Sequence, residues 1–296
     1  MQHIRIVTKQ PNFFFHMVQM SMKKKKKKNK YGFTALHIAA IENSKEATEV
    51  LLSHGANVNE DYEHGKTALH KAAYKNSIEA TEVLLSHGAN VNEDYEHGKT
   101  ALHKAAYKNS IEATEVLLSH GANVNEDYEH GKTALHKAAY KNSIEATEVL
   151  LSHGANVNED YEHGKTALHK AAYKNSIEAT EALLSHGANV NEKNKYGETP
   201  LHKAAYKNRK ETSEVLLSHG ANVNEDYEHG ETALHYAAYK NSNETAEVLL
   251  SHGANVNEKD KDVGTALHYA AYKNSNETTE LLLSYGANVN EKKKNK

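Results

Sequence analysis

Histidine has the most obvious capacity for chemistry in this chain, because its 22 imidazoles could bind a metal or transfer protons. The histidines do not cluster but recur at intervals of 33 residues, in columns represented by His64, His70 and His87. Residues one interval apart would occupy neighbouring layers of a repeated structure, and helical layers stack at roughly 8–10 Å. A zinc ion needs its ligand atoms at about 2.0–2.1 Å. The spacing therefore favours structural or solvated histidines, with His64 and its equivalents the most exposed, and predicts no metal site.

The other residue types give no catalytic pattern. The chain has no cysteine, which excludes disulfides, thiolate zinc sites and thiol catalysis. It also lacks the P-loop, the G-x-S-x-G elbow and the H-E-x-x-H zinc motif. Glu79 and Glu82 fit a solvated outer helix face better than an acid–base pair. We therefore expect no enzymatic activity and no cofactor.

A repeat of 33 residues organises nearly the whole sequence. All 16 glycines occupy repeat positions, so none remains for a loop that cradles phosphate. A Thr-Ala-Leu-His tetrad, written Thr-Pro-Leu-His in one copy, recurs at the same period. Its copies begin at Thr34, Thr67, Thr100, Thr133, Thr166, Thr199, Thr232 and Thr265. A constant period of this length is the signature of stacked repeat architectures.

Each unit is predicted to contain two short helices. Thr67 is a good cap for a first helix over Ala68–Lys75. Ser77 is expected to cap a second helix over Ile78–His87, and Gly88 supplies the left-handed residue that ends it. The polar, turn-rich stretch before the next tetrad is predicted to be a hairpin. Helices of about two turns are marginal alone, so the units must stack to bury their apolar faces.

These units resemble ankyrin repeats. The resemblance is carried by the 33-residue period together with G-x-T-A/P-L-H-x-A-A and L-L-x-x-G-A-x-V-N, and it covers eight repeats over residues 29–291. It implies an all-α fold, a solenoid of stacked helix pairs joined by β-hairpin loops. Asn76 and its equivalents depart from the family by replacing the usual glycine between the helices. Val263 occupies the hairpin-glycine column of the last repeat, where we expect a distorted turn.

The resemblance also implies where a partner would bind, since ankyrin proteins bind with their hairpin tips and the concave face of the first helix. Lysine and tyrosine on that helix are spaced i, i+3 and i+4, so they share one face. The predicted concave-face residues are Lys71, Tyr74, Lys75, Lys104, Tyr107, Lys108, Lys137, Tyr140, Lys141, Lys170, Tyr173, Lys174, Tyr206, Tyr239 and Tyr272. The predicted hairpin-tip residues are His64, Lys66, His97, Lys99, His130, Lys132, His163 and Lys165.

The function that follows is a monomeric, non-enzymatic scaffold that binds another protein, with an acidic or extended segment as the expected partner. An alternative is a product of repeat expansion without a dedicated partner. The copies Glu60–Asn92, Glu93–Asn125 and Glu126–Asn158 are identical, so their uniform columns fit recent duplication equally well. Tyrosine stems that cover an alanine-rich helix, with lysines solvating it, would give the same pattern.

Residues 1–28 differ in kind from the repeats. They contain no acidic residue and include six consecutive lysines, Lys23–Lys28. One interpretation is a nuclear-localisation or polyanion-binding tail, which makes nucleic-acid binding a second alternative function. Another is a disordered, solvated extension, and a third is that the natural chain begins at Met20 or Met22. Residues 292–296 are predicted to be a disordered tail.

Charge and hydropathy bound the remaining classes. The formal net charge is −3, and the unit contains five acidic residues against three lysines, so the repeats themselves do not favour nucleic acid. No apolar run approaches the roughly 18–20 residues of a membrane span, and we expect no membrane insertion. The lack of cysteine suits a reducing compartment. The expected location is the cytoplasm or the nucleus.

Overall fold

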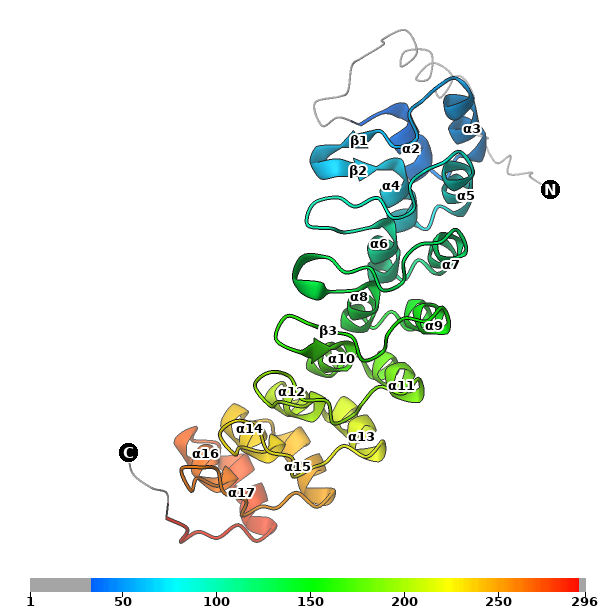
Figure 1. The fold of residues 1–296 in the computed structure, drawn as a ribbon. Helices are drawn as coiled ribbons and strands as arrows, with labels where there is room; N and C mark the ends of the chain where they lie inside the picture. Colours follow the sequence, from blue (N-terminus) through cyan, green and yellow to red (C-terminus); the bar gives the residue numbers. More distant parts are fainter. Residues whose placement is uncertain (1–32, 293–296) are drawn as a thin grey trace, which may run out of the picture.

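A computed structural model describes residues 33–292, which form a curved stack of helix pairs (Figure 1). The predicted all-α solenoid is confirmed, whereas Lys23–Lys28 and the rest of the predicted N-terminal extension lie outside the described residues. The first helices are α2 (Ala35–Ile41), α4 (Ala68–Lys75), α6 (Ala101–Lys108), α8 (Ala134–Lys141), α10 (Ala167–Lys174), α12 (Pro200–Tyr206), α14 (Ala233–Lys240) and α16 (Ala266–Tyr272). The second helices are α3 (Lys45–Ser53), α5 (Ile78–Ser86), α7 (Ile111–Ser119), α9 (Ile144–Ser152), α11 (Ile177–Ser185), α13 (Lys210–Ser218), α15 (Asn243–Ser251) and α17 (Asn276–Ser284).

Short hairpins connect successive helix pairs. In the first of them β1 (Asp61–Tyr62) pairs antiparallel with β2 (Lys66–Thr67) across the turn Glu63–Gly65. The strands β3 (Asp160–Tyr161) and β4 (Lys165–Thr166) repeat this arrangement further along the stack. Other hairpins keep a single antiparallel bridge, such as the one between Tyr95 and Lys99.

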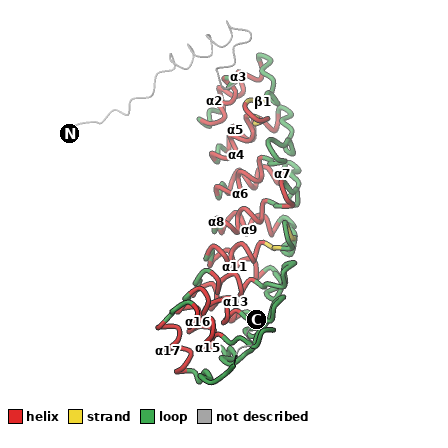
Figure 2. Tube along the Cα trace, turned by 90° about the vertical axis from the view of Figure 1, so that its left-hand side faces the viewer, coloured by secondary structure: helices red, strands yellow, loops and turns green. Residues whose placement is uncertain are grey.

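The core runs the length of the stack between neighbouring repeats. Each first helix packs on the first helix of the next repeat, and each second helix packs on the next second helix. Leu69 and Leu84 are fully buried in these interfaces, and Ala72 and Ala73 allow the first helices to approach closely. Figure 2 shows the resulting curve, with helices along one edge and loops along the other. The first helices and hairpins therefore hold their side chains in columns.

The tetrad histidine binds the start of its own first helix, and in four repeats its other ring nitrogen also contacts a backbone oxygen near the next hairpin. Nδ1 of His70 accepts a hydrogen bond from the Thr67 backbone N–H at 3.1 Å, which leaves the proton of the neutral ring on Nε2. In a later repeat Nε2 of His136 lies 3.1 Å from the backbone oxygen of Glu159, so this proton reaches the next hairpin. Burial lowers the pKa of His136 to about 3. His136 is thus a neutral structural group, in agreement with the interpretation drawn from the spacing.

Five second helices, α5, α7, α9, α11 and α15, are capped by an asparagine of the preceding repeat. The predicted cap by Ser77 is wrong, because its side chain makes no cap bond in α5. Instead the N–H of Ala80 donates to Oδ1 of Asn43 at 3.1 Å, and that of Ala113 donates to Asn76 at 3.0 Å. Asn76 has a left-handed backbone with φ of 56°, which directs its side chain to the neighbouring helix. Asparagine thus adds a bond between repeats that glycine could not make.

A second asparagine column joins the loops that follow the second helices. Asn59 accepts a hydrogen bond from the backbone N–H of Asn90 at 2.9 Å, and Asn92 does the same for Asn123 at 2.8 Å. The amide of Asn92 also donates to the backbone oxygen of Gly121 at 3.2 Å. The two asparagine columns therefore connect successive repeats by hydrogen bonds at two separate places.

The hairpin that contains Val263 keeps one backbone hydrogen bond of its pairing, and an aspartate side chain replaces the other, so the expected distortion is local. The N–H of Asp260 donates to Gly264 O at 2.8 Å, and the Asp260 carboxylate accepts from the N–H of Gly264 at 2.6 Å. Val263 nevertheless has φ of 60°, in the left-handed region where glycine stands in the other hairpins. A β-branched residue is disfavoured in this region because its side chain crowds the backbone.

Replacing Val263 with glycine is expected to stabilise the chain by about 1 kcal/mol. Relief of left-handed strain is worth of order 1–3 kcal/mol, and the added flexibility of glycine removes roughly 0.5–1 kcal/mol. Urea unfolding followed by circular dichroism measures the change. Val289→Gly is the control, because Val289 is exposed and is not in the left-handed region; it should leave stability unchanged or lower it. A lower midpoint for Val263→Gly would contradict the assignment of strain.

Candidate functional site

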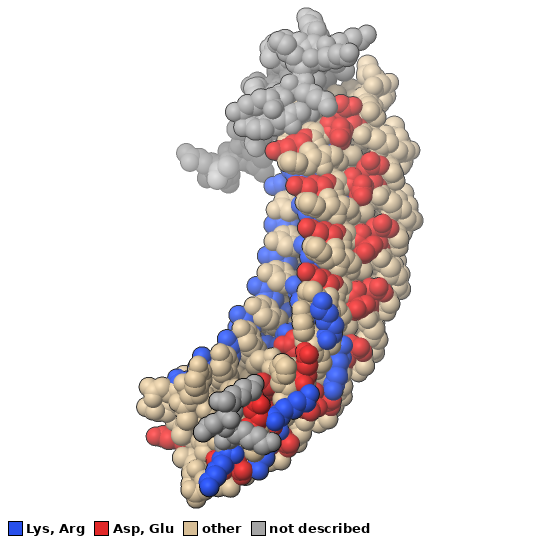
Figure 3. Space-filling model, turned by 60° about the vertical axis from the view of Figure 1, so that its left-hand side comes forward, with Lys and Arg blue, Asp and Glu red and all other residues tan. Residues whose placement is uncertain are grey.

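The concave face is formed by the outward side chains of the first helices and the adjoining bases of the hairpins. Figure 3 shows lysine and arginine atoms in a file along the inner side of the curve, while acidic atoms gather on a neighbouring face. The predicted lysine and tyrosine columns belong to the first helices, which lie along this side of the curve (Figure 2). The structure therefore separates opposite charges that are interspersed in the sequence of each unit.

The tyrosine column of the first helices, Tyr74 and its equivalents, contacts lysines of the same chain. The amine of a lysine in one repeat lies over the tyrosine ring of the preceding repeat, with Nζ 4.1–4.8 Å from the ring centroid. The pairs are Lys108–Tyr74, Lys141–Tyr107, Lys174–Tyr140, Lys207–Tyr173, Lys240–Tyr206 and Lys273–Tyr239. A cation–π contact at an exposed site stabilises by about 0.5–1 kcal/mol. These two columns thus contribute to the joining of repeats as well as to the surface.

The last tyrosine of this column is more exposed than the earlier ones. Tyr272, in the last described first helix, is 77% exposed, whereas Tyr74, Tyr107 and Tyr140 are half-buried. No further repeat stacks on Tyr272 within the described residues, so its ring has no lysine above it from a following layer. Exposure of the earlier rings is limited by the lysine of the next layer.

A second tyrosine column, which sequence reasoning missed, lies beneath the lysines at the base of the hairpins. Tyr62, Tyr95, Tyr128 and Tyr161 are only 4–5% exposed. The tetrad histidine of the preceding repeat packs against each ring, as between His70 and Tyr95, where the centroids are 4.9 Å apart in an edge-on arrangement. The sequence signal that could have predicted this column is the single aromatic residue at a fixed position in an otherwise polar hairpin.

The lysines in the column of Lys71 lie between the two tyrosine columns. Nζ of Lys104 is 5.1 Å from the ring centroid of Tyr95 and 5.6 Å from that of Tyr74. The lysines predicted at the hairpin tips also turn to this face, since Nζ of Lys99 is 5.6 Å from the ring of Tyr128. We define the lysine patch as Lys66, Lys71, Lys99, Lys104, Lys132, Lys137, Lys165 and Lys170.

The lysine patch has an excess of positive charge. None of its members forms an ion pair with a carboxylate among residues 33–292. Partial burial, together with the positive charges of Lys99 and Lys132, lowers the pKa of Lys137 to about 8. A hollow of about 390 Å³ opens beside it, lined by lysines and tyrosines and by one carboxylate, that of Glu96. The geometry suits an anionic group that would neutralise several ammonium groups together.

The hairpin-tip histidines are exposed but isolated from each other. His64, His97 and His130 have side chains that are 52–53% exposed, and each lies within 3.7–3.9 Å of the glutamate that precedes it. Within residues 33–292 no three His, Cys, Asp or Glu side chains form a group that could hold a metal ion. The tips can therefore contribute to a binding surface, but they do not combine into one site.

The composition of the concave face changes in the last repeats. The hairpin column that starts with Lys66 becomes acidic at Glu198 and Glu231, and the helix column that starts with Lys71 becomes Tyr236 and Tyr269. At the transition Lys203 forms an ion pair with Glu198. The concave face is thus basic over α4 to α10 and aromatic and acidic over α14 and α16.

Comparison with known proteins agrees with this architecture. The family described as ankyrin repeats (3 copies) matches residues 6–95, 92–161, 156–227 and 223–293. The chain belongs to the ankyrin-repeat family. Ankyrin repeats are generally modules for protein–protein interaction, and this fold is typically non-enzymatic.

A solved ankyrin structure is also similar to this chain. The crystal structure of the human ASB11 ankyrin repeat domain matches with a TM-score of 0.68 and 29% sequence identity. The match covers 75% of this chain and 99% of that one. Curated protein sequences give no match. Within residues 33–292, no helix is long and apolar enough to cross a membrane.

The electrostatics of the lysine patch predict that one lysine titrates near pH 8. In a ¹³C-lysine NMR titration, a signal with this midpoint should be absent from the Lys137→Arg variant. Lys99→Gln should move the midpoint upward, because it removes a neighbouring positive charge that disfavours the protonated amine. A titration in which every lysine has a midpoint above pH 10 would contradict the crowding of charge.

Proposed function

We propose that this ankyrin-repeat protein is a non-enzymatic scaffold that binds an extended acidic segment of a partner protein on the lysine patch. The observation that carries the proposal is that the lysine patch, which consists of two adjacent lysine columns, forms no ion pair within the described chain. Grouped, partly desolvated ammonium groups repel one another, and an anionic ligand relieves this repulsion. The tyrosine rings beside them offer apolar contact area to the same ligand.

The spacing of the lysines supports a particular conformation of the partner segment. Equivalent lysines are one repeat apart, which corresponds to roughly 8–10 Å between packed helices. A polyproline II segment has three residues per turn and rises about 3.1 Å per residue, so every third side chain lies on one side at intervals of about 9 Å. A segment with a carboxylate at every third position would therefore present one acidic group to each repeat.

The test uses two peptides of identical composition, one with Glu-Pro-Pro repeated four times and one with its four glutamates consecutive. The spaced peptide should bind more tightly, and its affinity should fall as salt rises because the contacts are ionic. Lys104→Ala combined with Lys137→Ala should weaken binding by about tenfold, which corresponds to loss of about 1.4 kcal/mol. Isothermal titration calorimetry measures both effects.

The matched control removes two lysines from elsewhere on the same chain. Lys45 and Lys210 are exposed on second helices, away from the lysine patch, so Lys45→Ala with Lys210→Ala changes net charge equally. Binding of the spaced peptide should change less than about twofold in this control, as long-range charge is screened by salt. Equal losses in the two double variants, or tighter binding of single-stranded RNA than of either peptide, would reject the proposal.

A further inference from the structure

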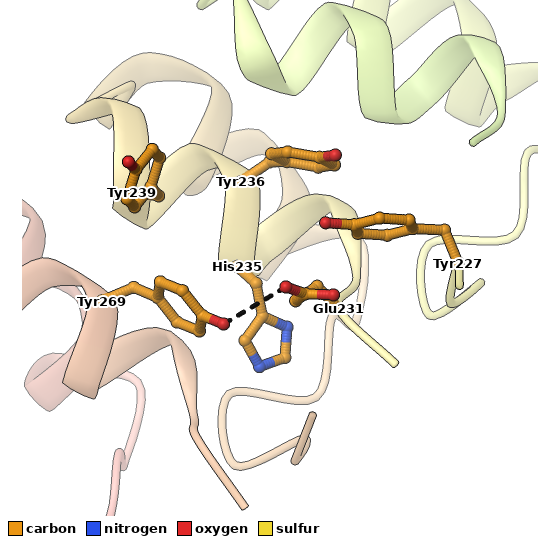
Figure 4. A pocket seen from close by; sticks show the side chains of 6 residues that line it. All are labelled: Tyr227, Glu231, His235, Tyr236, Tyr239 and Tyr269. Atoms are coloured by element: carbon orange, nitrogen blue, oxygen red, sulfur yellow. Dashed lines mark hydrogen bonds between the residues drawn. The ribbon is translucent and has the colours of Figure 1, made fainter. Parts of the chain in front are cut away.

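A small pocket occupies the aromatic part of the concave face, between α14 and α16 and the hairpin before α14. Its volume is about 160 Å³, and its lining residues are Tyr227, Glu231, His235, Tyr236, Tyr239 and Tyr269 (Figure 4). Four of these six residues are tyrosines, contributed by three separate segments of the chain. A cavity of about 150 Å³ can hold benzene, so this pocket has room for a group of five or six heavy atoms.

The rings form two walls of different geometry. Tyr227 and Tyr236 are stacked, with their centroids 5.1 Å apart and an angle of 14° between their planes. Tyr239 and Tyr269 meet nearly edge-on, with centroids 6.1 Å apart and an angle of 79°. In Figure 4 the rings surround a space toward which the Glu231 carboxylate also points. Aromatic faces carry partial negative charge and attract cations.

Carboxylates anchor the tyrosines and make the surroundings negative. The Tyr236 hydroxyl donates to Glu198 at 3.1 Å, and the Tyr269 hydroxyl donates to Asp260 at 2.7 Å. Burial is the main cause that raises the pKa of both phenols, and the adjacent carboxylates add to it. The phenols therefore stay neutral, and the pocket combines neutral rings with the carboxylate of Glu231, while the charge of Glu198 is offset by its ion pair with Lys203.

Glu231 provides an acceptor inside the pocket. Its Oε1 lies 3.3 Å from the Tyr269 hydroxyl, and the carboxylate also interacts with the Tyr227 hydroxyl. Hydrogen bonds to a charged group are stronger than those between neutral groups. A ligand that brings one N–H to this carboxylate would gain such a charge-assisted hydrogen bond.

The equivalent place in an earlier repeat is a larger and more basic hollow of about 390 Å³, whose lining includes Lys99, Lys104 and Lys137. There Lys104 lies over Tyr95 and Tyr74, but the same column holds Tyr236 here. Lys240 and Lys273 do contact the ring of Tyr239, although neither lines the pocket. Loss of the column lysine thus coincides with gain of aromatic rings and of a carboxylate.

We propose that this pocket binds the dimethylammonium group of a methylated lysine side chain of a partner protein. The two methyl groups and the adjacent methylene contact the tyrosine rings, while the single remaining N–H donates to the Glu231 carboxylate. An unmodified lysine ammonium brings three N–H donors to a site with one carboxylate, and it is more strongly hydrated. A trimethylammonium group has no N–H to donate to this carboxylate. The inference concerns a part of the face outside the lysine patch and does not depend on the acidic segment.

The test measures binding of Nα-acetyl-lysine amides to the full chain by NMR, with the unmodified, dimethyl and trimethyl side chains and with choline as separate probes. The dimethyl compound should bind at least about fivefold more tightly than the unmodified one, in line with one added hydrogen bond to a charged group. The trimethyl compound and choline should bind more weakly than the dimethyl compound. Equal binding of all probes, or tighter binding of choline, would overturn the proposal.

Variants tie the binding to the pocket. Glu231→Gln should abolish the preference for the dimethyl compound, and Glu231→Lys with Tyr236→Lys should abolish its binding. This double variant restores the residues that repeats over α4 to α10 carry in the same columns, so it is compatible with the fold. Glu228→Gln, at an exposed hairpin position, is the control and should bind normally. Unchanged preference in Glu231→Gln would overturn the role of the carboxylate, while binding of the spaced acidic peptide tests the lysine patch separately.

Discussion

The packing of each repeat on the next is the constraint on which the rest of this structure depends. A single helix pair exposes its leucines and alanines, and only a neighbouring pair can bury them, as for Leu84. Asparagines reinforce the same interface, since Asn76 caps a helix of the following repeat. Because every interface repeats the same contacts, every residue type is held in a column with nearly constant spacing. Surface chemistry on this chain is therefore a property of columns.

One scaffold supports two different surfaces because the interface and the concave face use different residues. Leu69, Ala72 and the tetrad histidine are kept through the change from a basic to an aromatic surface. The column of Lys66 in the hairpins and that of Lys71 on the first helices are replaced, while the first helices persist in every described repeat. Where Lys104 contacts Tyr95 and Tyr74 in an earlier repeat, Tyr236 takes the equivalent position in a later one, and the hollow beside it changes from basic to aromatic and acidic. Divergence in the last repeats thus locates a surface that duplication alone would not produce.

The sequence predicted the fold well because the 33-residue period specifies both the helices and their stacking. It failed where a residue's partner lies in another repeat. Serine is a residue type favoured at helix N-caps, but the side chain that accepts from the helix N–H belongs to Asn43 of the preceding repeat and not to Ser77. The lysine and tyrosine columns were identified, whereas their contact across layers was not. The pocket at Glu231 was missed because its walls come from a hairpin and two helices that no local pattern connects.

The central claim is that the concave face has two parts that recognise opposite charges. Photo-crosslinking with mass spectrometry tests it directly, using the spaced acidic peptide and a dimethyl-lysine peptide, each with a photoreactive group, alone and together. We expect crosslinks of the acidic peptide within residues 60–191 and of the dimethyl-lysine peptide within residues 225–272, with neither peptide displacing the other. Crosslinks of both peptides to the same repeats, or mutual displacement, would contradict it.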